Sequence, residues 1–188
     1  MRLFLTVLAL AMVPLIQGCV VAAIGGAAVA GYAVGEDRRT PAVIADDEAI
    51  EFKIRNRVSE KHSNAHISAV SYNRMVLMNG TAPSDAAKTD IERIVRGVEN
   101  VRGVYNEMTV GPNRNFPSLA GDGVLTTKVK TRMVDARKFN PLHVKVVSDD
   151  GAVYLLGIVK RQDAEAATEI ARTTSGVKRV VRMFEYQD

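Results

Sequence analysis

The sequence has little that would equip a catalytic centre or a stacking surface. Among its 188 residues there is no tryptophan, one cysteine and three histidines, and aromatic residues make up 5%. So few aromatic side chains argue against a large sugar- or base-stacking surface, and a lone cysteine excludes both a disulfide framework and a cysteine-rich zinc site. The formal net charge of +4 is too small to indicate a nucleic-acid partner by itself. The remaining composition, 47% hydrophobic and 24% charged, is typical of a folded globular protein.

The first nineteen residues, MRLFLTVLALAMVPLIQGC, have the features of an export signal. Arg2 supplies a positive start, and the apolar run from Leu3 to Ile16 is too short to favour a membrane-spanning helix. We therefore predict a signal peptide over residues 1–18. Because the only cysteine directly follows a small residue, the segment also resembles a bacterial lipobox, which implies cleavage before Cys19 and acylation of its thiol and new amine. An ordinary signal peptide with a chance cysteine is the alternative.

A segment poor in large side chains follows the cysteine. Residues 20–35 read VVAAIGGAAVAGYAVG, and their four glycines argue against a stable helix. We predict a flexible tether over residues 19–45, starting with the lipidated Cys19. A glycine-zipper membrane segment is the alternative, although sixteen residues are short for a span. Val20, in place of an aspartate after the cysteine, implies through the lipobox resemblance that the anchor lies in the outer membrane.

The rest of the chain carries one pattern twice, and we call the repeats copy one (residues 46–110) and copy two (residues 122–188). Three pairs of segments align: residues 47–58 with 122–133, the strand around Gly80 with that around Gly157, and Val101–Val104 with Val177–Val180. Residues 111–121 between the copies are rich in Gly, Pro, Asn and Ser, which predicts a linker.

Each copy is predicted to run helix, strand, strand, helix, strand. Apolar residues recur at helical spacing in the first helices, at Ile50, Ile54 and Val58 in copy one and at Leu125, Val129 and Met133 in copy two. Asp47 and Asp122 precede these stripes and are the predicted N-caps. Because the second helix of each copy separates the second strand from the third, it is a crossover. We therefore expect an α+β fold in which each copy packs a three-stranded mixed sheet against two helices.

Glycines mark turns and strand interiors. Asp149–Gly151, between two β-branched runs, predicts a hairpin turn. Asn79-Gly80 has the composition of a turn, but its counterpart Leu156-Gly157 lies inside a predicted strand. Gly80 and Gly157 are therefore expected at a bulge or at a close helix-on-sheet contact. The last strands are expected at residues 101–110 and 177–186.

Together, the αββαβ unit, the glycine within the second strand, the Val-x-x-Val before the last strand and the lipobox resemble the BON domain. The whole chain is similar to the dual BON-domain outer-membrane lipoproteins of Gram-negative bacteria, which are associated with division and outer-membrane integrity. This resemblance implies a non-enzymatic protein, lipid-anchored at the periplasmic face of the outer membrane. It also implies binding of anionic phospholipid and support of outer-membrane integrity, in some members at the division site.

The charge of the two copies indicates which one would meet an anionic surface. Copy one has nine basic and ten acidic residues, whereas copy two has twelve basic and nine acidic residues, a net charge of −1 against +3. In the first helix of copy two, small apolar and hydroxyl side chains form the predicted solvent face and basic side chains flank it, which suits a headgroup interface. We predict that this face binds anionic phospholipid such as phosphatidylglycerol or cardiolipin; a merely solvated basic face is the alternative. The predicted lipid-binding residues are Val124, Thr127, Lys128, Lys130, Thr131, Arg132, Val134 and Arg137.

A second surface is predicted on the sheet of copy two. Helices cover only one face of the sheet, so the apolar side chains on the other face need another cover. These side chains belong to Tyr154, Leu156, Ile158, Val181 and Met183. We expect copy one or a partner protein to cover them. The alternative function is therefore a periplasmic adaptor that binds outer-membrane assembly proteins, such as the barrel-assembly complex, through this face. A peptidoglycan or polysaccharide binder is a third hypothesis, which the scarcity of aromatic residues weakens.

Signals of catalysis or metal binding are weak. His62 and His66 are four residues apart, as in a helical metal pair, but they lie where a loop enters a strand and no carboxylate or cysteine completes the set. We therefore expect no enzyme activity, no catalytic residues, no metal site and no cofactor. Export disfavours a nucleic-acid partner.

Overall fold

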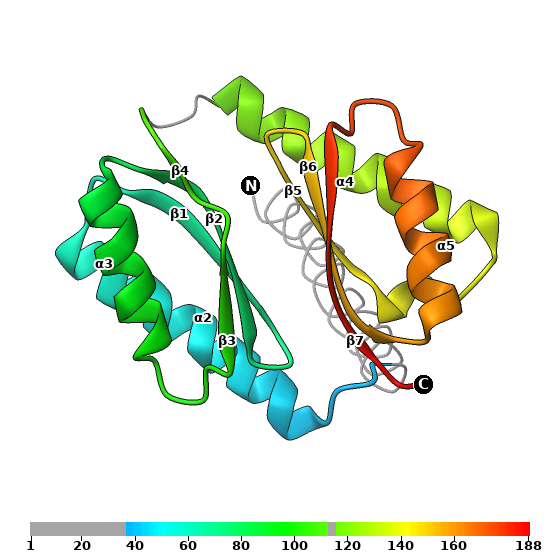
Figure 1. The fold of residues 1–188 in the computed structure, drawn as a ribbon, viewed down its shortest axis with the longest axis horizontal. Helices are drawn as coiled ribbons and strands as arrows, with labels where there is room; N and C mark the ends of the chain where they lie inside the picture. Colours follow the sequence, from blue (N-terminus) through cyan, green and yellow to red (C-terminus); the bar gives the residue numbers. More distant parts are fainter. Residues whose placement is uncertain (1–36, 113–115) are drawn as a thin grey trace, which may run out of the picture. The chain divides into compact units, whose positions relative to one another are not determined.

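The computed structural model describes residues 37–112 and 116–188. The predicted signal peptide 1–18, Cys19 and most of the predicted tether lie outside these residues. The elements of the first repeat are α2 (Pro41–Lys61), β1 (His66–Tyr72), β2 (Met75–Ala82), α3 (Asp85–Arg96), β3 (Gly103–Asn106) and β4 (Thr109–Val110) (Figure 1). Those of the second repeat are α4 (Phe116–Ala136), the 3₁₀ turn η1 (Pro141–His143), β5 (Lys145–Asp149), β6 (Ala152–Val159), α5 (Arg161–Arg172) and β7 (Arg179–Tyr186).

Both sheets are mixed, and the predicted α+β fold is confirmed. β2 lies antiparallel to β1 and parallel to β3, and β6 has the same relation to β5 and β7. The sheet of copy one differs from the prediction, because β3 and the short β4 both pair with β2 and replace a single last strand. The ladder breaks at Met108, whose side chain is buried in the core while its backbone N–H donates to Asn106 Oδ1 at 3.2 Å.

The first helix of each repeat starts earlier than the sequence indicates. α2 begins at Pro41, so residues 41–45 are helical and not part of a flexible tether, and α4 begins at Phe116, inside the predicted linker. In α2 the cap is Thr40, whose Oγ1 accepts a hydrogen bond from Val43 N, and Pro41 occupies the first helical position, where its missing N–H costs nothing.

Asp47, the predicted cap of this helix, has a different role. Its buried carboxylate lies on the second turn of α2 and accepts hydrogen bonds from Ser71 Oγ, Asn73 N and Arg74 N. Arg39 Nη1 contacts the same carboxylate at 2.7 Å. Asp47 therefore holds the β1–β2 turn against α2, an arrangement that depends on residues more than twenty positions away.

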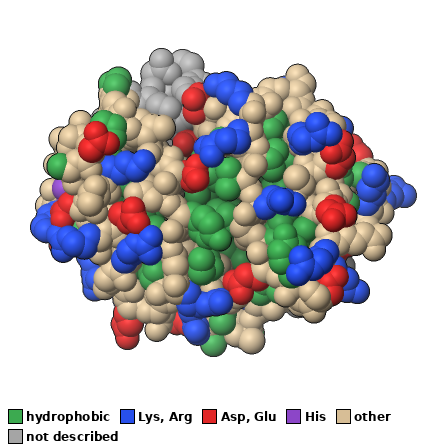
Figure 2. All heavy atoms as spheres, in the orientation of Figure 1, with side chains coloured by type: hydrophobic (Ala, Val, Ile, Leu, Met, Phe, Trp, Pro, Cys, Tyr) green, Lys and Arg blue, Asp and Glu red, His purple; other side chains and the backbone are tan. Residues whose placement is uncertain are grey.

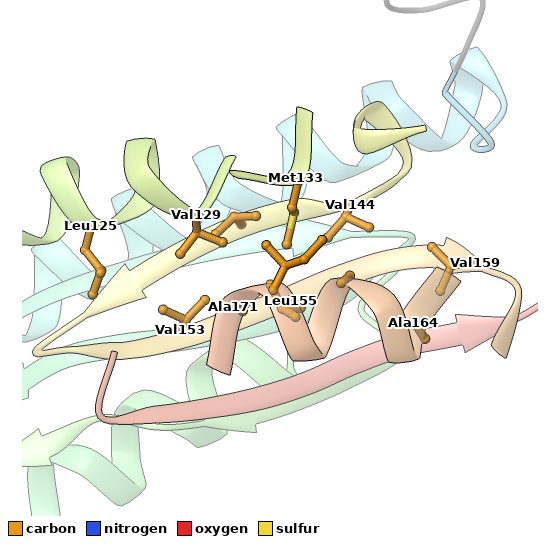
Figure 3. Packing of buried hydrophobic residues seen from close by; sticks show 12 residues of the cluster. Leu125, Val129, Met133, Val144, Val153, Leu155, Val159, Ala164 and Ala171 are labelled. Carbon is orange, nitrogen blue, oxygen red and sulfur yellow. The ribbon is translucent and has the colours of Figure 1, made fainter. Parts of the chain in front are cut away.

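In each repeat the two helices pack on one face of the sheet. Figure 3 shows the core of copy two, in which Leu125, Val129 and Met133 of α4 point toward β6 and α5. The equivalent stripe in copy one, Ile50, Ile54 and Val58, is buried in the same way. The apolar periodicity of both first helices thus predicted their buried faces correctly.

Gly80 and Gly157 lie where their strands approach another backbone. A Cβ atom at Gly80, which has φ +110°, would collide with the His66 carbonyl oxygen, and one at Gly157 would collide with the His143 carbonyl oxygen. The β1–β2 register continues through Ile67↔Gly80 without interruption. The expected bulge or helix contact is therefore wrong for Gly80: the close neighbour is the paired strand.

This contact predicts a marked effect of adding one methyl group. Gly80→Ala is expected to lower the free energy of unfolding by roughly 1–3 kcal/mol, because the new Cβ forces the strands apart and the positive φ is strained for alanine. Urea unfolding measures the change. Gly111→Ala is the matched control, since nothing lies within 4 Å of its added Cβ. Equal stability of the two variants would contradict the prediction.

Candidate functional site

The predicted lipid-binding face lies on the solvent side of α4. Leu125, Val129 and Met133 turn into the core, whereas the side chains of Val124 and Val134 are 57% and 56% exposed. Within the described residues no helix is long and apolar enough to cross a membrane. All members of the predicted set are exposed: Val124, Thr127, Lys128, Lys130, Thr131, Arg132, Val134 and Arg137.

Two of the predicted basic residues differ from the others. Arg132 Nη1 donates to Ile170 O at 3.0 Å and to Thr174 Oγ1 at 2.7 Å, so its guanidinium joins α4 to the C-terminal end of α5. Arg137 follows the last helical residue and has φ +50°, so it does not continue the helical face. The sequence pattern predicts Arg132 and Arg137 on opposite flanks of the exposed stripe, because it treats the helix as uninterrupted and does not show that α5 lies beside it.

Lys128 and Lys130 are the basic residues that remain available. Both are exposed, and neither forms an ion pair with any residue that the structure describes. Their counterparts in copy one are Lys53, which pairs with Glu99 at 3.0 Å, and Arg55. The unpaired charge of α4 therefore lies beside exposed valine and threonine side chains.

A groove of about 680 Å³ lies beside these residues. Its lining includes Val124, Thr127 and Lys128 of α4 together with Thr174 and Ser175, which follow α5. A neighbouring recess of about 420 Å³ shares Val124, Lys128 and Ser175. Sequence reasoning missed Thr174 and Ser175, because no periodicity relates a loop after one helix to the surface of another.

The second predicted surface is buried between the two sheets. The faces turned away from the helices meet in one apolar cluster, to which copy one contributes Tyr72 and Leu77. Figure 2 shows hydrophobic side chains in the middle of one face of the molecule, with acidic and basic side chains around them. Tyr154 and Leu156 are each 1% exposed, Met183 is buried, and Ile158 and Val181 are partly buried against the cluster.

Polar contacts surround this cluster. Glu185 of β7 accepts from Asn73 Nδ2 at 2.8 Å and pairs with Arg102 at 3.2 Å. Arg179, on the same strand as Glu185, pairs with Glu107 of copy one at 2.9 Å. Because exposed ion pairs contribute little, the apolar burial supplies most of the stabilisation between the two sheets.

Burial in this cluster raises the pKa of Tyr154 to about 12. Between pH 10.0 and about 12 the folded chain keeps the phenolic proton, whereas an unfolded chain, with a tyrosine pKa of 10.0, releases it. The stabilising difference is therefore complete below pH 10 and is lost as the pH rises toward 12.

We accordingly expect the free energy of unfolding to fall between pH 10 and 12. In Tyr154→Phe this fall should be smaller, because phenylalanine has no proton to lose. Denaturant unfolding at a series of pH values measures both slopes, and parallel slopes in the two proteins would refute the assignment.

The two histidines do not form a metal site in the structure's described part. His62 Nε2 lies 2.8 Å from Asp90 Oδ2, while His66 is exposed at the start of β1. Hydrogen bonds from His62 and Arg93 lower the pKa of Asp90 to about 2. No group of three or more His, Cys, Asp or Glu side chains in the described residues could hold a metal ion.

Known proteins share this architecture. The BON domain family matches residues 46–112 and 121–188. "Outer membrane lipoprotein DolP" of Haemophilus influenzae is 43% identical over 176 residues, which cover 92% of this chain and 91% of that protein. "21 kDa hemolysin" of Actinobacillus pleuropneumoniae is 30% identical over 80% of this chain and 79% of its own. "Osmotically-inducible protein Y" of Escherichia coli is 30% identical over 72% and 70%.

Proposed function

This chain belongs to the dual BON-domain outer-membrane lipoprotein family, and from that premise we propose that it binds anionic phospholipid through α4 of its second BON domain. In this proposal the protein is anchored through Cys19 at the periplasmic face and maintains outer-membrane integrity, with a role at the division site. The role requires no catalysis, and BON-domain lipoproteins are not enzyme families.

The solvent face of α4 is the observation that supports lipid binding most directly. Val124 and Val134 are more than half exposed, and Lys128 and Lys130 stand beside them without ion partners in the described chain. On a membrane surface the ammonium groups would contact phosphate, while the valine methyl groups would reach the acyl boundary. This combination of exposed methyl groups and unpaired ammonium groups matches the two layers of a bilayer surface.

The expected affinity of this face is low. Each basic residue near an anionic bilayer contributes about 1 kcal/mol, so Lys128 and Lys130 together supply about 2 kcal/mol. A free energy of that size corresponds to a dissociation constant of roughly tens of millimolar. The predicted acyl anchor would offset this by holding the domain at a high effective concentration near lipid, so that α4 orients the protein and selects the headgroup.

The alternative role as an adaptor has less support. Its predicted binding surface, Tyr154, Leu156, Ile158, Val181 and Met183, packs against Tyr72 and Leu77 of copy one. A partner such as the barrel-assembly complex would have to displace copy one to reach it. We therefore retain lipid binding as the function.

Vesicle sedimentation at lipid concentrations of roughly tens of millimolar, where so weak an affinity still gives measurable binding, tests this function. Residues 38–188, which form one compact unit, should sediment with vesicles that contain phosphatidylglycerol or cardiolipin and should stay in solution with phosphatidylcholine alone. Binding should weaken as salt is added, because exposed charges are screened. Equal sedimentation with both kinds of vesicle, or none with anionic vesicles, would overturn the proposal.

A further inference from the structure

The outer edge of β1 offers backbone groups to a further strand. In the part of the chain that the structure describes, β1 pairs with β2 alone. The backbone groups of Ser71 point away from β2: its N–H donates to Glu51 Oε1 at 2.8 Å, and its carbonyl oxygen accepts from Lys145 Nζ at 3.5 Å. Because alternate residues of an antiparallel strand turn the same way, Ile67 and Ala69 also turn their N–H and C=O groups away from β2.

Ile67 and Ala69 also line a groove of about 460 Å³ between β1 and α2. Its lining includes Ile54 and Val58 of α2, which are almost fully buried, and the partly buried Ile67 and Ala69 of β1. A groove of this size is within the range that holds bound ligands. An unpaired strand edge beside an apolar groove is the arrangement by which proteins bind extended peptides through strand addition.

The charges of the groove limit what it accepts. Two lining residues already have partners. Lys145 Nζ lies 3.6 Å from the Glu51 carboxylate, and the Asp90 carboxylate lies 2.8 Å from His62 Nε2. Arg55 is exposed in the lining and has no ion pair with any described residue. An occupant with one acidic side chain is therefore favoured over a neutral or a basic one.

We propose that this groove binds an extended peptide segment of a partner protein, which adds to β1 as a further strand and pairs an acidic side chain with Arg55. A bilayer fits the surface less well, because copy one has a net charge of −1 and the groove is concave. A lipid also lacks the alternating N–H and C=O groups that Ile67 and Ala69 would pair with. The site lies on copy one and does not depend on lipid binding by α4.

A defined peptide tests the proposal on the full-length protein in detergent. The probe is a synthetic peptide of about nine residues that alternates valine with threonine and has a central aspartate, a length that spans one strand. Hydrogen exchange should show slower exchange at the Ile67 and Ala69 amides when the probe is present. A peptide of the same length with proline at alternate positions should give no protection, because proline cannot donate to the ladder.

Two variants separate the backbone and charge contributions. Ala69→Pro removes one outward N–H while leaving the β2 pairing intact, and it should abolish binding. Arg55→Glu should weaken binding about tenfold, whereas Arg57→Glu, two residues along the same helix and in contact with Gly97 O, should leave it unchanged. If Ala69→Pro does not fold, the arginine pair still decides.

Three outcomes would overturn the proposal. The first is equal binding of the alternating and the proline-containing peptides, and the second is equal binding by the Arg55→Glu and Arg57→Glu variants. The third is protection of Ile67 and Ala69 that appears without the probe, either with rising protein concentration or with vesicles. That result would assign the edge to a second copy of this chain or to lipid instead.

Discussion

Lys128→Glu combined with Lys130→Glu is expected to abolish the binding of residues 38–188 to vesicles that contain phosphatidylglycerol. The substitutions replace about 2 kcal/mol of attraction with repulsion of similar size. The resulting loss of about 4 kcal/mol lowers the affinity by roughly three orders of magnitude. Both side chains are exposed and unpaired among the described residues, so folding should be unaffected, which circular dichroism and thermal unfolding can verify. Arg132 is left unchanged because it holds α4 to α5.

Lys53→Glu combined with Arg55→Glu is the matched control for this experiment. These residues occupy the same positions in α2 of copy one, and the double variant changes the net charge by the same amount. If α4 is the docking surface, the control should retain most of the binding. A similar loss in both double variants would show that binding depends on net charge alone and would remove α4 from the proposal.

Leu156→Ala is expected to lower the free energy of unfolding by about 2–5 kcal/mol, as large-to-small changes in well-packed cores do. Leu156 lies in the cluster between the sheets and is 1% exposed, and Leu77 of copy one is buried in the same cluster. Leu77→Ala should have a similar effect. The double variant should lose less than the two single losses together, by at least about 0.5 kcal/mol, because both side chains share one packed volume.

Leu142→Ala provides the comparison for these variants. Its side chain is 49% exposed in copy two, so the substitution should change stability by less than about 0.5 kcal/mol. Chemical denaturation of the unchanged protein, the two single variants and the double variant gives the coupling directly. Strict additivity of Leu77→Ala and Leu156→Ala would mean that these two side chains do not stabilise each other across the sheets.

Patterns that repeat along the chain were sufficient to predict most of the fold. The stripe of Leu125, Val129 and Met133 identified both the buried face of α4 and, opposite it, the exposed Val124 and Val134. Helical periodicity places every residue on the surface of one element, and the amphipathic face is determined by that element alone. The Asp149–Gly151 turn was predicted for the same local reason, and Asp150 and Gly151 both have the positive φ that such a turn needs.

The equivalent turn in copy one shows where local signals fail. Asn73 and Arg74 also have positive φ, but a turn with arginine at the second position has no strong sequence signal. Its conformation is supported by the Asp47 carboxylate, which accepts hydrogen bonds from both backbone N–H groups. The sequence alone indicates a helix cap at Asp47, because that is the commonest role of an aspartate before an apolar stripe.

The sequence by itself determined the duplication, the α+β elements and the faces of the helices, because each depends on spacing within one segment. Only the tertiary structure decided that copy one covers Tyr154 and Leu156, that Arg132 is committed to α5, and that the edge of β1 lies open beside a groove. Each of these depends on atoms brought together from distant parts of the chain. Such contacts follow from the packing of whole helices and strands. They cannot be predicted from the spacing of residues within one segment.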